Sequence, residues 1–275
     1  MQIVTLHLKD IYPFLGENDA DPVLTAYIQQ NSIQGLEKRT GILLCPGGGY
    51  GAISDREGEP IALELLAMGC NVFVLKYSVK LFRFPTQLRE VAASMEQIHA
   101  NAEAWSIDPH KIAIMGFSAG GHLAAHYSNA YDCREVREVF PESKPVQGSI
   151  LGYPVISAEA LCVHMGSFRN LTGETDPFPQ EFINKYSCHL LVSEKTPPAF
   201  IWHTAEDTVV PVSSSLVYAQ ALAAQKIPFS LHIYPHGPHG LSTVDGQTNG
   251  ALKPGCEMAR TWLPELKNWL NDLFG

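Results

Sequence analysis

The chain has 275 residues, of which 45% are hydrophobic and 17% are charged, and its formal net charge at pH 7 is −9. This composition excludes an intrinsically disordered chain, which would be poor in apolar residues and rich in charge. The acidic balance argues against nucleic acid or an anionic membrane as the main partner, because phosphate binding requires clustered Lys and Arg.

The remaining compositional features favour a cytoplasmic protein. The opening residues MQIVTLHLKD lack the basic segment and apolar core of a secretory signal, and no apolar run is long enough to span a membrane. The six cysteines show no CxxC spacing. We therefore expect reduced thiols, with neither disulfides nor a cysteine metal site.

Predicted strands and helices alternate along the chain. Strands are expected at 3–8, 23–29, 41–45, 71–77, 111–117, 146–155, 198–204 and 229–235. Helices are expected at 60–69, 85–105, 119–130, 213–225 and 256–274. This alternation predicts an α/β fold, with a mostly parallel central sheet and helices on both faces. We expect one domain over residues 1–275.

The segment 156–197 does not fit this alternation. It carries several large apolar side chains, among them Phe168, Phe178 and Tyr186. One interpretation is a cap-like insertion that lines or covers a site, as long excursions often do. The other is an ordinary helical insertion with a small core of its own. The sequence leaves both open.

A glycine-flanked serine, GFSAGG at 116–121, stands between a predicted strand and a predicted helix. A sharp strand-to-helix turn projects a nucleophilic hydroxyl above a sheet, and it requires glycine two residues before and two residues after the serine. Ser118 meets this requirement and is the candidate nucleophile. The alternative is a tight turn in which the serine is incidental.

A serine nucleophile needs a histidine to take its proton and a carboxylate to orient that histidine. Asp207 follows the predicted strand 198–204, and His239 follows the strand 229–235. We prefer these two residues, in the order Ser, Asp, His. Glu206 and His236 are the respective alternatives. No HExxH spacing occurs, so a metal site is not expected.

A second glycine cluster, PGGGY at 46–50, follows the predicted strand 41–45. Ester hydrolysis places negative charge on the carbonyl oxygen, and two backbone N–H groups must stabilise it. Ala119, which follows the serine, is one candidate donor, and Gly48 and Gly49 are the others. A dinucleotide-binding loop is the competing interpretation, but the GxGxxG spacing is missing.

These motifs together resemble the α/β-hydrolase superfamily, in its esterase and lipase branch. The residues that carry the resemblance are PGGGY at 46–50, GFSAGGHLAA at 116–125, HTAEDTVVP at 203–211 and HGPHGLS at 236–242. The chain is similar to the hormone-sensitive-lipase-like esterases and to the acetyl-xylan-esterase or feruloyl-esterase-like group. Pro46 stands where the lipase-like members usually have histidine, which favours the carbohydrate-esterase-like group. The resemblance implies hydrolysis of short-acyl esters without a cofactor.

The function predicted from the sequence is that of a serine carboxylesterase acting on short-acyl esters, acetyl esters of carbohydrates above all. The expected partner is a small-molecule ester such as an acetylated sugar, and a homodimer is compatible with this class. Tyr50, Phe82 and Tyr153 are the expected walls of the substrate pocket. Two alternatives stay open: a peptidase of the prolyl-oligopeptidase kind, and a non-catalytic binding protein on a hydrolase scaffold.

Overall fold

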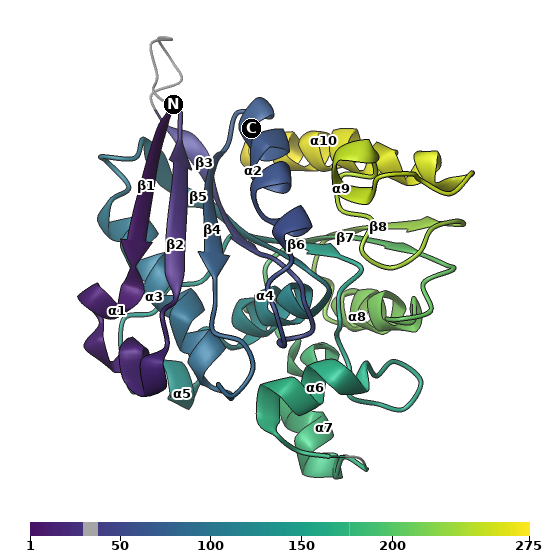
Figure 1. Ribbon diagram of the computed structural model, residues 1–275, viewed down its shortest axis with the longest axis horizontal. Helices are drawn as coiled ribbons and strands as arrows, with labels where there is room; N and C mark the ends of the chain where they lie inside the picture. Colours follow the sequence, from purple (N-terminus) through teal and green to yellow (C-terminus); the bar gives the residue numbers. More distant parts are fainter. Residues whose placement is uncertain (30–37, 176) are drawn as a thin grey trace.

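The computed structural model describes residues 1–29, 38–175 and 177–275. Its strands form one sheet, which runs through the middle of the molecule (Figure 1). They are β1 (Gln2–His7), β2 (Val23–Ile28), β3 (Arg39–Cys45), β4 (Asn71–Lys76), β5 (Ile107–Phe117), β6 (Gly148–Gly152), β7 (Ala199–Thr204) and β8 (Phe229–Tyr234). The order is β1-β2-β4-β3-β5-β6-β7-β8. Pairing is antiparallel from β1 to β2 and from β2 to β4, and parallel from there to β8.

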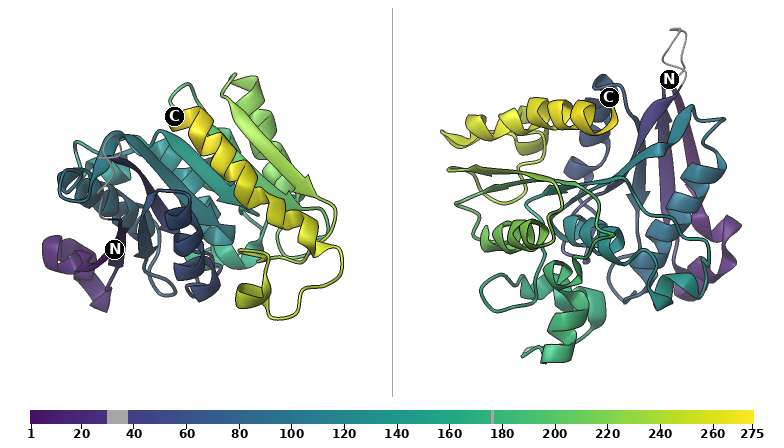
Figure 2. Two further views of the ribbon diagram at one scale, coloured as in Figure 1. Left: turned by 90° about the horizontal axis from the view of Figure 1, so that it is seen from above. Right: turned by 180° about the vertical axis from the view of Figure 1, so that it is seen from behind.

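Helices cover both faces of this sheet (Figures 1 and 2). One face carries α3 (Thr86–Ala100), α4 (Ser118–Ala130) and α8 (Ser213–Ala224), and the other carries α2 (Glu59–Ala67) and α10 (Trp262–Phe274). Successive strand residues point to opposite faces, so Leu43 packs in the core with Leu123 of α4 and Leu44 packs in the core with Leu266 of α10. The predicted mostly parallel sheet with helices on both faces is therefore confirmed.

The closing helix begins later than expected. In place of one helix over 256–274, the structure has a 3₁₀ helix, η4 (Cys256–Thr261), followed by α10. Pro264 explains the break, because it has no N–H to donate to a preceding carbonyl and is tolerated only in the first turn of an α-helix. Starting the α-helix at Trp262 places Pro264 in that turn.

The segment between β6 and β7 folds into short helices at one end of the molecule (Figure 1). They are α6 (Met165–Thr172), α7 (Gln180–Tyr186) and the 3₁₀ helix η3 (Cys188–Leu191). Phe168 and Phe182 from this segment form a small separate core with Val155 and Val210. The other short elements are α1 (Leu8–Ile11), η1 (Pro13–Asp19), η2 (Asp55–Glu57), α5 (Arg134–Arg137) and α9 (Gly246–Asn249).

Within the described ranges, no helix has the length and hydropathy needed to cross a bilayer.

Candidate active site

Ser118 lies at a sharp turn between β5 and α4. Its φ of 52° is in the left-handed region, which a residue with a side chain adopts only when its surroundings enforce it. The close packing around Gly120 is part of these surroundings. A Cβ on Gly120 would come within 2.1 Å of the carbonyl oxygen of Cys45, at the end of β3. The turn is thus packed directly against the loop that follows β3, with the hydroxyl of Ser118 at the carboxyl end of the sheet.

A chain of hydrogen bonds joins the three residues singled out in the sequence. Ser118 Oγ lies 2.8 Å from His239 Nε2, and His239 Nδ1 lies 2.6 Å from Asp207 Oδ2. A carboxylate can only accept, so Nδ1 carries the proton and Nε2 is left to accept from the serine hydroxyl. The arrangement therefore directs Nε2, the basic nitrogen of the neutral tautomer, at the hydroxyl.

Asp207 is buried and surrounded by donors. The amides of Val209 and Val210 each donate to its Oδ1 at 2.9 Å, and His203 Nε2 lies 3.2 Å from its Oδ2. Burial alone would raise the pKa of Asp207, but the hydrogen bonds from His203, His239 and the Val210 amide outweigh burial and hold the pKa well below its usual value. The carboxyl group is therefore ionised at neutral pH.

The alternative acid and base lie elsewhere. His236 Nδ1 is 2.9 Å from Glu206 Oε1, and both side chains are more than half exposed. This pair contacts neither Ser118 nor Asp207 through a hydrogen bond in the part of the chain that the structure describes. The structure thus separates the four candidates into one pair hydrogen-bonded to the serine and one surface pair.

The glycine loop after β3 is held from three sides. Glu57 Oε2 accepts from the amide of Gly47 at 2.8 Å, the Tyr77 hydroxyl donates to the carbonyl of Pro46 at 2.7 Å, and Asn170 Nδ2 donates to the carbonyl of Gly49 at 2.9 Å. These contacts hold the loop by the amide of Gly47 and by the carbonyls of Pro46 and Gly49.

Three amides remain for a ligand. Those of Gly48 and Gly49 donate no hydrogen bond within the described residues. Gly48 has a φ of 124°, a conformation that requires glycine. The Ala119 amide is in the first turn of α4, where amides have no intrahelical partner. The loop and the helix thus supply the N–H groups that an oxyanion would need.

A cavity of about 330 Å³ contains Ser118 and His239. Its other lining residues are Gly48, Gly49, Ser54, Arg56, Glu57, His164, Val209 and Gly240. His164 comes from the segment 156–197 and was not among the site residues expected from the sequence. The only signal for it is weak: a histidine one residue before a helix, three positions ahead of Ser167, can act as an N-cap.

None of the three residues expected to form the pocket walls lines the cavity of Ser118. Tyr50 and Tyr153 are 1% and 2% exposed, and neither lines the cavity. His122 Nε2 lies 2.8 Å from the carbonyl of Tyr186, which can only accept. Burial lowers the pKa of His122 to about 4, so Nδ1 of the neutral ring accepts from the Tyr50 hydroxyl at 2.8 Å. Phe82 lines a different depression, with Thr86. An aromatic residue in a loop can point into the protein as easily as toward a ligand.

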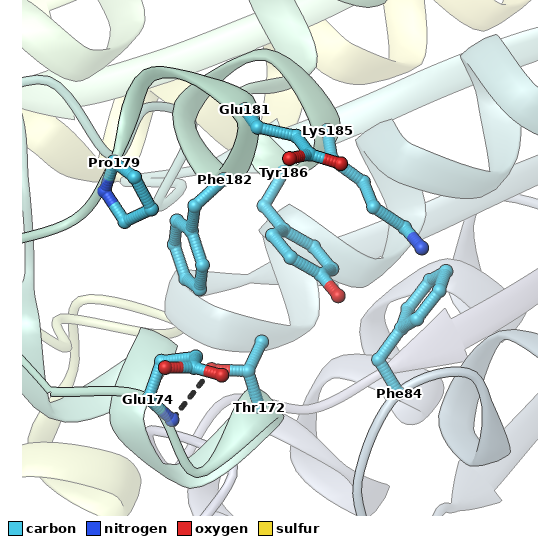
Figure 3. Close-up of a pocket in the computed structure, with 8 residues that line it drawn as sticks. All are labelled: Phe84, Thr172, Glu174, Pro179, Glu181, Phe182, Lys185 and Tyr186. Atoms are coloured by element: carbon cyan, nitrogen blue, oxygen red, sulfur yellow. Dashed lines mark hydrogen bonds between the residues drawn. The ribbon is translucent and has the colours of Figure 1, made fainter.

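A second cavity, of about 290 Å³, lies between α7 and the loop before α3 (Figure 3). The rings of Phe84, Phe182 and Tyr186 form its apolar surface, with Lys185 beside them (Figure 3). None of the residues that line it lines the cavity of Ser118.

With this geometry established, the chain can be compared with known proteins. A family model described as BD-FAE matches residues 37–222, which is more than half of the sequence. The chain belongs to the BD-FAE family. This assignment agrees with the predicted resemblance to esterases of the α/β-hydrolase superfamily.

Two curated relatives of this BD-FAE chain are at least 35% identical to it over the residues that align. It is 37% identical over 236 residues to endo-1,4-β-xylanase B of Butyrivibrio fibrisolvens and 35% identical over 198 residues to acetylxylan esterase of Xylanibacter ruminicola. The alignments cover 82% and 71% of this chain but only 35% and 39% of the two relatives.

Solved structures match the BD-FAE chain over nearly its whole length. The acetyl ester-xyloside bifunctional hydrolase from Caldicellulosiruptor lactoaceticus superposes with a TM-score of 0.83 at 34% identity, covering 98% of this chain and 96% of that one. A carboxylesterase from Lactobacillus plantarum gives 0.78 at 28% identity, covering 99% and 98%. These matches confirm the α/β-hydrolase fold, and the predicted enzyme class, carboxylic ester hydrolase, agrees with them.

Proposed function

We propose that this protein is a serine carboxylesterase that removes short acyl groups, acetyl in the first place, from a carbohydrate alcohol. The observation that carries the proposal is the hydrogen-bonded chain from Ser118 through His239 to Asp207. Ser118 and His239 line a cavity that Gly48 and Gly49 also line. The similarity to an acetylxylan esterase and to an acetyl ester-xyloside hydrolase supports acetyl as the acyl group and a sugar as the alcohol.

The geometry supports the following sequence of steps. His239 Nε2 takes the proton of Ser118 as its Oγ attacks the ester carbonyl. Asp207, held ionised by its donors, stabilises the imidazolium and keeps its Nδ1–H in place. The amides of Ala119 and of Gly48 or Gly49 bind the oxyanion, each contributing on the order of 3 kcal/mol to the barrier reduction.

Collapse of this tetrahedral intermediate releases the alcohol. His239 Nε2–H gives its proton to the leaving oxygen, and the acyl group stays on Ser118 as an ester. Water then enters, loses a proton to His239 and attacks the acyl carbonyl, which frees the carboxylic acid and restores the serine hydroxyl.

The test is hydrolysis of p-nitrophenyl esters from acetate to decanoate by the wild type and by Ser118→Ala, with unfolding curves for both. We expect a preference for acetate and a loss of kcat of about a thousandfold or more in the variant, at similar stability. Near-wild-type activity of Ser118→Ala would overturn the mechanism. A preference for the long chains would overturn the short-acyl assignment.

A further inference from the structure

The segment between β6 and β7 contributes one polar side chain to the cavity of Ser118. His164 is the N-cap of α6 and lines the cavity together with Gly49 and His239. Its ring lies next to the glycine loop, because a Cβ on Gly49 would be 4.0 Å from its Cε1. The steps described above give it no task.

Hydrogen bonding fixes which nitrogen of His164 carries the proton. The backbone amide of Ser167, which can only donate, lies 3.3 Å from His164 Nδ1, and the Ser167 hydroxyl lies 2.8 Å from the same nitrogen. Nδ1 is therefore an acceptor without a proton, and the proton of the neutral ring is on Nε2.

The ring stays neutral at the pH where the enzyme would work. Burial lowers the pKa of His164 and the neighbouring His239 lowers it further, while Asp207 acts in the opposite direction. Protonation of Nδ1 would also remove the hydrogen bond from the Ser167 amide that caps α6. His164 thus adds no charge to the cavity and does not compete with His239 as a base.

The Nε2–H of His164 has no acceptor among the described residues. A half-buried N–H donor without a protein partner, in the wall of a cavity, is suited to an acceptor on a ligand. Among the oxygens of an acetylated sugar, the carbonyl oxygen faces the backbone amides and the ester oxygen must receive the proton of His239. The hydroxyl beside the esterified carbon is the nearest acceptor left.

We propose that His164 Nε2–H donates a hydrogen bond to the hydroxyl adjacent to the esterified oxygen, and so selects monoesters of vicinal diols, as in sugars. This assignment rests on the proposed esterase function. It makes the segment 156–197 part of the alcohol-binding wall, through a single neutral donor.

The test compares two esters that differ in one group. In 2-hydroxyethyl acetate the alcohol carries a neighbouring hydroxyl, and in propyl acetate a methyl group replaces it. We expect the wild type to prefer the hydroxy ester, in kcat/KM, by about three- to tenfold, the size of one neutral hydrogen bond. His164→Asn and His164→Ser keep an N-cap on α6, but their shorter side chains carry no donor to the position of Nε2, and the ratio should come close to one.

The matched control is His189→Asn, the same substitution in the same segment outside the cavity, which should keep the wild-type ratio. Urea unfolding of each variant reports whether the fold is retained. A wild-type ratio near one, or a preference that survives in His164→Asn and His164→Ser, would overturn the role of His164 while Ser118-dependent hydrolysis upholds the esterase. Failure to cleave either ester in a Ser118-dependent reaction would overturn both proposals.

Discussion

The phenol of Tyr153 donates a hydrogen bond to the buried carboxylate of Glu57, with 2.6 Å between the two oxygens. The other oxygen of Glu57 accepts from the amide of Gly47, and the Tyr153 oxygen accepts from the amide of Ser242 at 3.0 Å. One phenol and one carboxylate therefore connect the glycine loop after β3 with the loop that carries His239. The Tyr153 ring also packs against the imidazole of His239, with 5.0 Å between ring centroids.

Tyr153→Phe removes this connection without removing the ring. The carboxylate of Glu57 then loses a donor while still buried, so we expect the free energy of unfolding to fall by about 1–3 kcal/mol. We also expect kcat to fall, because both loops that flank Ser118 lose a shared support. Tyr131→Phe is the control, since the Tyr131 hydroxyl makes no hydrogen bond within the described residues. Equal stability of the two variants, measured by urea unfolding, would contradict this role of Tyr153.

His203 contacts the same carboxylate oxygen of Asp207 as His239 does. Its Nε2 faces two acceptors, Asp207 Oδ2 at 3.2 Å and the carbonyl of Val210 at 3.0 Å, and therefore carries a proton. Its Nδ1 lies 2.8 Å from the Ser215 hydroxyl. His203 is thus a positioning residue for the carboxylate.

We expect His203→Leu to lower kcat/KM by roughly tenfold or more, because a hydrogen bond to a charged group is lost. His203→Gln can place an amide N–H near the same oxygen and should retain more activity. Steady-state kinetics of both variants decide the point. If Leu and Gln at position 203 lower kcat/KM equally, packing and not the hydrogen bond explains the loss.

Asn170 of α6 holds the carbonyl of Gly49 and so the direction of the adjacent peptide groups. Removing its amide in Asn170→Ala should loosen the loop that supplies oxyanion donors, and we expect kcat to fall about tenfold with little change in KM. Asn184→Ala on α7 serves as the control. A raised KM with unchanged kcat would instead indicate that Asn170 binds the substrate in its ground state.

The buried carboxyl group of Glu90 should make the stability of the protein depend on pH. Glu90 is fully buried on α3, where its carboxyl group accepts hydrogen bonds from the amide and the hydroxyl of Ser78. Burial raises its pKa from 4.5 to about 7, and the two hydrogen bonds offset only part of that effect. Between these pH values the folded protein holds a proton that the unfolded chain has released. This contribution to stability is therefore full below pH 4.5 and is lost as the pH rises through 7.

The loss amounts to about 3 kcal/mol for a shift of this size. Glu90→Gln has no proton to lose, so its free energy of unfolding should vary less between pH 5 and pH 8 than that of the wild type. Glu96→Gln, on the same helix, should keep the wild-type slope. Parallel slopes for the wild type and Glu90→Gln in urea unfolding would contradict the raised pKa.

The sheet and the positions of the three hydrogen-bonded residues could be predicted from the sequence, because the patterns that indicate them are local. Ser118 stands between glycines that only a sharp turn requires, and Asp207 and His239 follow apolar strands by a few residues. In a parallel sheet, the carboxyl ends of such strands meet at one edge. The roles of the three residues remain a prediction until activity is measured.

The walls of the cavity were not predictable in the same way. Tyr50 and Tyr153 were expected to face the substrate, yet both are buried and use their hydroxyls to hold other residues. Which side of a loop an aromatic ring takes depends on partners distant in the sequence, such as His122 and Glu57. His164 lies in the segment without strand-helix alternation, where no pattern indicated that it would line the cavity of Ser118.

The contact between Asn170 and Gly49 also matters for redesign of this enzyme. A chimera that replaced the segment 156–197 to change which alcohols are accepted would remove this support of the glycine loop along with His164. Turnover and selectivity would then change together, and a library of such chimeras would contain mostly slow variants. To vary selectivity without slowing turnover, one would exchange residue 164 alone, or keep Asn170 in every chimera.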